Sequence, residues 1–182
     1  MANYYIYLIS SLPLLLFGMK PPFTFERFLI LSDGLIPEED VTVIKNSSIF
    51  GEYDYTVKQP TLKKWVEYDT ALRNELVRLR AARKHLEPAK YLREDIYVDS
   101  SIPHIALAAL RNPSILEGER FLDLERWKFL DELSMGHYFD LDFLIIYALK
   151  LLILERWEAI RSPDKSKLLE DVLLKTKTSE KA

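Results

Sequence analysis

The segment that most constrains the fold is residues 143–154, where every residue except Lys150 is apolar. A helix that is apolar on all sides has to be covered, either by the rest of its own protein or by a partner. Crossing a bilayer takes about 20 apolar residues, and the wider run 141–154 is shorter and also contains Asp142. We therefore predict that residues 143–154 form the central helix of a folded core.

Glycine scarcity narrows the fold class further. The chain has 182 residues but only five glycines, whereas a typical protein contains about 7% glycine. Tight hairpins, phosphate-binding loops and nucleotide-binding fingerprints depend on glycine, so helix is favoured over sheet. Hydrophobic residues make up 48% and charged residues 29% of the chain, which is a globular composition at a length typical of one domain.

These features predict an all-α, single-domain protein, with about seven or eight helices arranged around the central one. The domain is expected to span residues 1–182. Residues 46–60 mix polar residues and aromatics without helical spacing, and we predict an ordered loop there. Residues 61–85 contain no glycine or proline and are rich in helix formers, so they are predicted to form a long helix. A short amphipathic helix is predicted from residue 163, and the tail 176–182 is expected to fray.

Capping residues mark several helix ends. Thr24 is placed to accept a hydrogen bond from the first turn of a helix, as are Asn112 before a proline and Asp140 before the apolar segment. We expect these three residues to be N-caps. Gly118, inside the helix that follows Asn112, has two interpretations: it lets a neighbouring helix approach closely, or it breaks its own helix. The sequence does not decide between them.

The first residues form the second long apolar stretch. Residues 4–17 are apolar enough to suggest a signal peptide or a membrane anchor. No basic segment precedes them, Pro13 interrupts them and Lys20 follows, so the run falls short of the about 20 residues that span a bilayer. We therefore predict a buried core segment and no membrane insertion. The chain has no cysteine, which fits a reducing compartment, and a cytoplasmic location is expected.

Basic residues gather on the helix predicted at 61–85. Arg73, Arg80 and Lys84 share one face of that helix. Guanidinium groups bind phosphates and carboxylates with two hydrogen bonds, so this face is a candidate anion-binding surface. The alternative is a solvated face, partly neutralised by pairs such as Asp69 with Arg73. The net charge of −3 gives no overall attraction to nucleic acid, and nucleic-acid binding is not expected.

Three aromatic residues form a second candidate surface. Phe50, Tyr53 and Tyr55 lie in the loop predicted at 46–60. An exposed patch there would suit protein binding, because aromatic side chains such as Tyr often anchor interfaces. The three tryptophans fall instead within helical apolar patterns, and they are expected in the core.

One histidine lies close in sequence to two carboxylates. His137, Asp140 and Asp142 offer donors for a metal ion or for acid–base chemistry. Only His137 and Asp140 have the three-residue spacing of a helical ligand pair, and Asp140 is better explained as an N-cap. His85 and His104 are isolated. We therefore expect no metal site, no cofactor and no catalytic residues, and a catalytic site assembled from distant residues remains the alternative.

Several short sequence segments, spread over most of the chain, resemble those of a known family. They are Tyr4-Tyr5-Ile6-Tyr7-Leu8, Ser11-Leu12-Pro13, Lys20-Pro21-Pro22, Leu72-Arg73-Asn74-Glu75-Leu76, Phe139-Asp140-Leu141-Asp142 and Tyr147-Ala148-Leu149-Lys150-Leu151. Together they resemble an uncharacterised bacterial family known only as a domain of unknown function, whose genes tend to lie among those of V-type ATPases. The last long helix is also similar to part of the V-type ATPase C/d subunit, a helical protein that seats the central stalk on the membrane rotor ring.

The resemblance implies association with a rotary ATPase as a stalk component, assembly factor or regulator, and it carries over no catalytic residues. Our leading hypothesis is a cytoplasmic, non-enzymatic, protein-binding component or accessory factor of a bacterial V-type ATPase, which reaches the membrane only through that complex. The second hypothesis is a nucleic-acid or phosphate-ligand binding module that uses the helix from Arg73 to Lys84. The third is an enzyme whose site is not visible in the sequence. The sequence predicts no oligomeric state.

Overall fold

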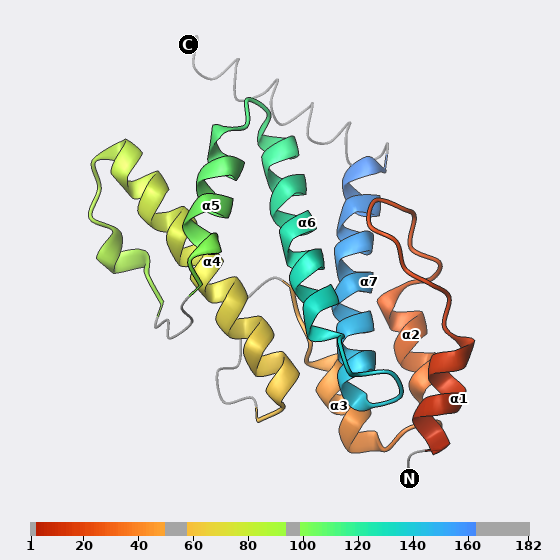
Figure 1. Cartoon of the computed structure of the whole chain (residues 1–182). Helices are drawn as coiled ribbons and strands as arrows, with labels where there is room; N and C mark the ends of the chain where they lie inside the picture. Colours follow the sequence, from red (N-terminus) through yellow and green to blue (C-terminus); the bar gives the residue numbers. More distant parts are fainter. Residues whose placement is uncertain (1–2, 50–57, 94–98, 163–182) are drawn as a thin grey trace, which may run out of the picture.

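The computed structural model describes residues 3–49, 58–93 and 99–162 (Figure 1). These residues form seven α-helices and one short 3-10 helix, and no strand occurs among them. The predicted all-α, single-domain, multi-helix fold is therefore confirmed. In chain order the helices are α1 (Asn3–Ser11), α2 (Phe25–Ser32), α3 (Glu38–Lys45), α4 (Pro60–Lys84), η1 (Pro88–Tyr91), α5 (Ser101–Arg111), α6 (Ile115–Leu133) and α7 (Leu141–Arg161).

Helix α7 lies between two groups of helices. On one side it packs against α6 and α4, and α5 contacts both of these. On the other side it packs against α2 and α3, which also contact each other. Figure 1 shows α1 and the long connection 12–24 on this second side, next to α2. The chain from α1 to α3 therefore covers the side of α7 that α4 to α6 leave open.

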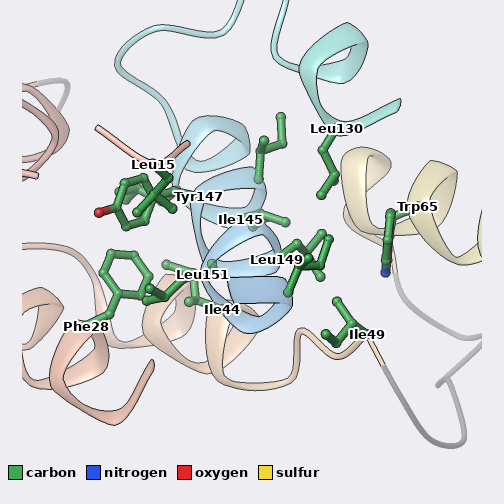
Figure 2. Close-up of a cluster of buried hydrophobic side chains, with 14 of the residues drawn as sticks. Leu15, Phe28, Ile44, Ile49, Trp65, Leu130, Ile145, Tyr147, Leu149 and Leu151 are labelled. Carbon is green, nitrogen blue, oxygen red and sulfur yellow. The ribbon is translucent and has the colours of Figure 1, made fainter. Parts of the chain in front are cut away.

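The apolar segment 143–154 fills the centre of the core, as predicted. Figure 2 shows that Phe28 and Leu15 lie on one side of α7, and that Trp65 and Ile49 lie on the other. Burial of each large aliphatic side chain contributes about 1.5–3 kcal/mol, so α7 is the main source of hydrophobic stabilisation. The buried residues of α7 are Leu144, Ile145, Ile146, Tyr147, Ala148, Leu149, Leu151, Ile153, Leu154 and Trp157.

A second, smaller core lies where α4, α5 and α6 meet, and Gly118 is part of its construction. A Cβ atom added to Gly118 would lie 2.7 Å from the backbone oxygen of Ala109 on α5. The glycine therefore allows α5 and α6 to approach closely, which decides between the two interpretations of this residue. The buried apolar residues of this core are Tyr68, Ala71, Leu72, Leu76, Ile102, Ala106, Ala109 and Leu122.

Two of the three predicted N-caps are confirmed. The side chain of Thr24 accepts a hydrogen bond from the backbone N–H of Arg27, and that of Asp140 accepts one from Phe143. The prediction for Asn112 is wrong, because Ser114 caps α6 instead. The proline after Asn112 favours an extended conformation at Asn112, so this residue ends α5, and its side chain accepts a bond from the N–H of Ser114.

Several predictions fall partly or wholly outside the described residues. Within the loop predicted at 46–60, residues 46–49 and 58–59 are non-helical, and residues 50–57 are not described. The short helix predicted from residue 163 and the tail 176–182 also lie outside the described residues. In the part of the chain that is described, no helix is both long enough and apolar enough to cross a membrane.

Candidate functional site

The predicted basic face of α4 is connected to a buried network of ion pairs. At the centre of this network, Arg126 of α6 lies between two fully buried carboxylates. Its Nε is 2.7 Å from Asp69 Oδ1 on α4, and its Nη1 is 2.9 Å from Asp123 Oδ1. Burial alone would lower the pKa of Arg126, but the two negative charges outweigh this effect and raise that pKa. The guanidinium therefore stays charged inside the protein.

The second oxygen of each buried carboxylate is also occupied. Arg73 Nε lies 2.5 Å from Asp69 Oδ2, which confirms the pair predicted between these residues. Arg156 Nη1 lies 2.7 Å from Asp123 Oδ2, and the indole N–H of Trp157 donates to the same oxygen. The network thus joins α4, α6 and α7, and its charges are compensated by hydrogen-bonded partners, as buried charges require.

Of the predicted anion-binding trio, Arg73 is the residue most engaged within the fold. Besides Asp69, its guanidinium donates to the backbone oxygen of Ile49 at 2.8 Å. Arg80 is half exposed, with Nη2 3.8 Å from Glu119 Oε1, and Lys84 is exposed at the end of α4. The structure therefore places Arg80 and Lys84 at the surface and directs Arg73 towards the core. The aromatic trio Phe50, Tyr53 and Tyr55 lies outside the described residues.

A surface that the sequence analysis did not identify lies at the N-terminal end of the chain. Several large apolar side chains of α1, of the connection 12–24 and of α2 are exposed to solvent, Leu14 by 82% and Tyr7 by 69%. We call this set the N-terminal apolar surface. Its residues are Ile6, Tyr7, Leu14, Leu16, Met19 and Ile30.

The N-terminal apolar surface corrects the prediction of a buried core segment. That prediction holds for Leu8, Ile9 and Leu15, which are buried, but it is wrong for their exposed neighbours. On α1 itself, Ile6 and Tyr7 line an open depression together with Ser10 and Ser11. The sequence did contain a signal for this surface, because the first charged residue of the chain is Lys20.

A polar cluster lies where α7 begins. Nδ1 of His137, in the turn before α7, is 2.6 Å from Asp140 Oδ2 and 3.8 Å from Asp142 Oδ2. Asp142 Oδ1 accepts hydrogen bonds from the side chains of Gln59 and Thr61 at the start of α4. The three residues that the sequence analysis considered together, His137, Asp140 and Asp142, are therefore brought together in space. We call them the α7-start cluster.

Tyr5 of α1 connects this region to a further carboxylate, Asp40. Its hydroxyl donates a hydrogen bond to Asp40 at the start of α3. Burial raises the pKa of Tyr5 to about 12, assisted by the hydrogen bond to Asp40 and by the charges of Asp40, Asp140 and Asp142. The carboxylates at the starts of α3 and α7 thus form one acidic region near Tyr5.

The fold and its surfaces define an all-α, single-domain protein with an exposed apolar N-terminal surface. A family model described as "Protein of unknown function (DUF2764)" matches residues 104–177, which include most of α5 and all of α6 and α7. No curated protein matches the chain significantly, and no solved structure does so. The predicted resemblance to a domain of unknown function is therefore confirmed for this part of the chain. Its association with V-type ATPases stays a prediction.

Proposed function

We propose that this protein is a non-enzymatic binding component that docks onto another protein through its N-terminal apolar surface. The observation that carries the proposal is the exposure of six large apolar side chains of residues 6–30, in a fold that buries most of the apolar side chains of α7. Apolar side chains that are gathered on one part of a surface are typical of protein–protein interaction sites. Tyr7 supports this interpretation, because tyrosine is enriched among residues that dominate binding energy.

The chemistry of this surface indicates what its partner is like. The chain carries no charged side chain before Lys20, so α1 and most of the connection that follows it offer no charge to a partner. Binding should therefore depend on apolar burial and shape, and salt should affect it little, because screening acts on charges. A partner of matching chemistry presents an apolar groove or helix face.

The identity of the partner rests on the resemblance found in the sequence. That resemblance favours a subunit of a bacterial V-type ATPase, with this protein acting as a stalk component, an assembly factor or a regulator. The expected location is the cytoplasm, or the membrane surface through the ATPase complex. The match to a family of unknown function at residues 104–177 is compatible with this role and adds nothing about the partner.

Affinity capture tests the proposal directly. The protein is tagged at its C-terminus, to keep the N-terminal apolar surface accessible, expressed at native level in its own cells, and its partners are identified by mass spectrometry. We expect recovery of V-type ATPase subunits. The double variant Leu14→Asp/Met19→Asp should recover at least about tenfold less, since charged groups resist burial in an apolar interface.

A matched control separates loss of the surface from loss of folding. Leu86 is exposed by 53% just after α4 ends, and Figure 1 shows that end of α4 far from α1. The variant Leu86→Asp should therefore recover the same subunits as the unmodified protein. Failure of the unmodified protein to recover any ATPase subunit would refute the proposed partner. Equal recovery by the double variant would refute the proposed surface.

A further inference from the structure

We infer that the α7-start cluster is a binding site for a divalent first-row transition cation, with Zn²⁺ as its best probe. His137 offers a ring nitrogen, and Asp140 and Asp142 offer one carboxylate oxygen each. All three atoms lie within 4.8 Å of one another. A metal site of this kind does not depend on the proposed protein-binding function, because it uses none of the residues of the N-terminal apolar surface.

Each carboxylate of the cluster has one oxygen bound outside the cluster and a second oxygen near His137, and Asp140 Oδ2 is hydrogen-bonded to the Nδ1 of that histidine. A bound cation would replace this hydrogen bond. Asp140 Oδ1 caps α7 by accepting from the N–H of Phe143 at 3.0 Å, and Asp142 Oδ1 accepts from Gln59 and Thr61. In both residues it is Oδ2 that lies nearest to His137 Nδ1. Hydrogen bonds from outside the ligand set thus orient each carboxylate, as outer partners do in metal sites.

The charge around the cluster also favours a cation. Within the part of the chain that the structure describes, no Lys or Arg forms an ion pair with Asp140, Asp142 or the nearby Asp40. The buried carboxylates Asp69 and Asp123, by contrast, are paired with arginines. The α7-start cluster therefore differs from the buried ion network, because among the described residues the only basic group paired with its carboxylates is the imidazole of His137.

The donor set selects the type of ion. One imidazole nitrogen and two carboxylate oxygens suit Zn²⁺ and related ions, whereas Mg²⁺ and Ca²⁺ prefer oxygen ligands alone. Zn²⁺ binds nitrogen and oxygen at about 2.1 Å in tetrahedral geometry, which places neighbouring donors roughly 3.4 Å apart. The distances from His137 Nδ1 to the two oxygens, 2.6 and 3.8 Å, fall on either side of this value. Small side-chain movements would accommodate the ion, and solvent would complete its coordination.

The test is a calorimetric titration of untagged, chelator-treated full-length protein with ZnCl₂, and with MgCl₂ for comparison. We expect one Zn²⁺ per chain and much weaker Mg²⁺ binding. His137→Ala and Asp140→Asn should each weaken Zn²⁺ binding by at least about tenfold, since each removes a ligand atom. Asn caps helices as well as Asp does, so Asp140→Asn preserves the structural role of the residue and removes the carboxylate.

His104→Ala is the matched control, because His104 is an exposed histidine on α5. It should leave the affinity for Zn²⁺ unchanged. Circular dichroism of each variant shows whether the helical fold is retained. The inference is wrong if the unmodified protein binds no Zn²⁺, or if His137→Ala and Asp140→Asn bind it as tightly as His104→Ala does.

Discussion

Two apolar regions of this chain differ in how far the fold buries them. Residues 143–154 are apolar apart from Lys150, and the helices of the same chain cover most of them. Residues 4–17 are almost as apolar, yet the fold buries Leu8, Ile9 and Leu15 and leaves Leu14 and Leu16 exposed. Hydrophobicity in the sequence therefore does not by itself distinguish a core segment from a binding surface. What distinguishes them is whether the rest of the chain supplies a cover.

The helices that pack against α7 are also joined by buried ion pairs, which the N-terminal region lacks. Around α7 the buried charges form a network that joins three helices through Asp69, Asp123 and Arg126. Residues 1–19 contain no charged side chain at all. Paired charges as well as apolar packing therefore hold α4, α6 and α7 together, whereas the large apolar side chains exposed in residues 6–30 have no cover in the described part of the chain.

The largest expected effect is the loss of a buried carboxylate. Asp123→Ala would leave Arg126 without one of its two partners and would remove the acceptor of the Trp157 indole N–H. It would also remove one carboxylate partner of Arg156, which still pairs with Glu119. Removal of one member of a buried ion pair costs about 3–5 kcal/mol of stability. Urea unfolding followed by circular dichroism measures this loss. A change below about 1 kcal/mol, the range of surface ion pairs, would contradict the structural role of the network.

Truncation of a leucine in each region tests the comparison itself. Leu149 is fully buried on α7, so Leu149→Ala should lower the free energy of unfolding by about 2–5 kcal/mol. Leu14 is 82% exposed, so Leu14→Ala should change it by no more than about 0.5 kcal/mol. Both values come from the same urea titration. Similar losses in the two variants would mean that the N-terminal region belongs to the core.

A smaller effect is expected where α5 and α6 meet. In Gly118→Ala the new methyl group would lie 2.7 Å from the backbone oxygen of Ala109, closer than two such atoms can approach. Overpacking of this kind costs about 1–3 kcal/mol, and it outweighs the higher helix propensity of alanine. Gly136→Ala is not a suitable control, because Gly136 has a φ of 89°. Thermal unfolding measures the change, and an increase in stability would show that the helices are not in close contact.

The smallest effect concerns Tyr5 and alkaline pH. Its pKa is raised from 10.0 to about 12 in the folded protein, so the folded state holds the phenolic proton more tightly than the unfolded state does. This contribution is fully present below pH 10 and is lost as the pH rises towards 12. The stability difference between the unmodified protein and Tyr5→Phe should therefore shrink over that range. Urea unfolding of both proteins over that pH range measures the difference, and a difference that does not change with pH would contradict the raised pKa of Tyr5.

The helices could be predicted from the sequence because their signals are local. Apolar spacing, the caps Thr24 and Asp140, and the absence of glycine and proline from residues 61–85 act within one helix. The cap at Asn112 was predicted wrongly because residues with capping side chains, Asn112 and Ser114, lie on both sides of one proline. Which of the two residues caps α6 depends on the backbone conformation that the proline favours at the residue before it.

The candidate sites could be predicted only in part, because they depend on contacts between helices. The Asp69–Arg73 pair lies within one helix and was predicted from its four-residue spacing. Its extension to Arg126 requires α6 to pack beside α4, which no spacing reveals. In the same way, the convergence of His137 with Asp142 depends on the turn before α7. The exposure of Leu14 depends on which helices fail to cover it.

Site-specific photo-crosslinking in the native cells is the most direct test of the claim that the N-terminal apolar surface is a docking site. A photoreactive amino acid replaces Leu14 in one variant and Lys84, at the exposed end of α4, in another. The account predicts a covalent adduct between position 14 and a V-type ATPase subunit, and little or none from position 84. Adducts from position 84 alone, or no protein adduct from position 14, would contradict it.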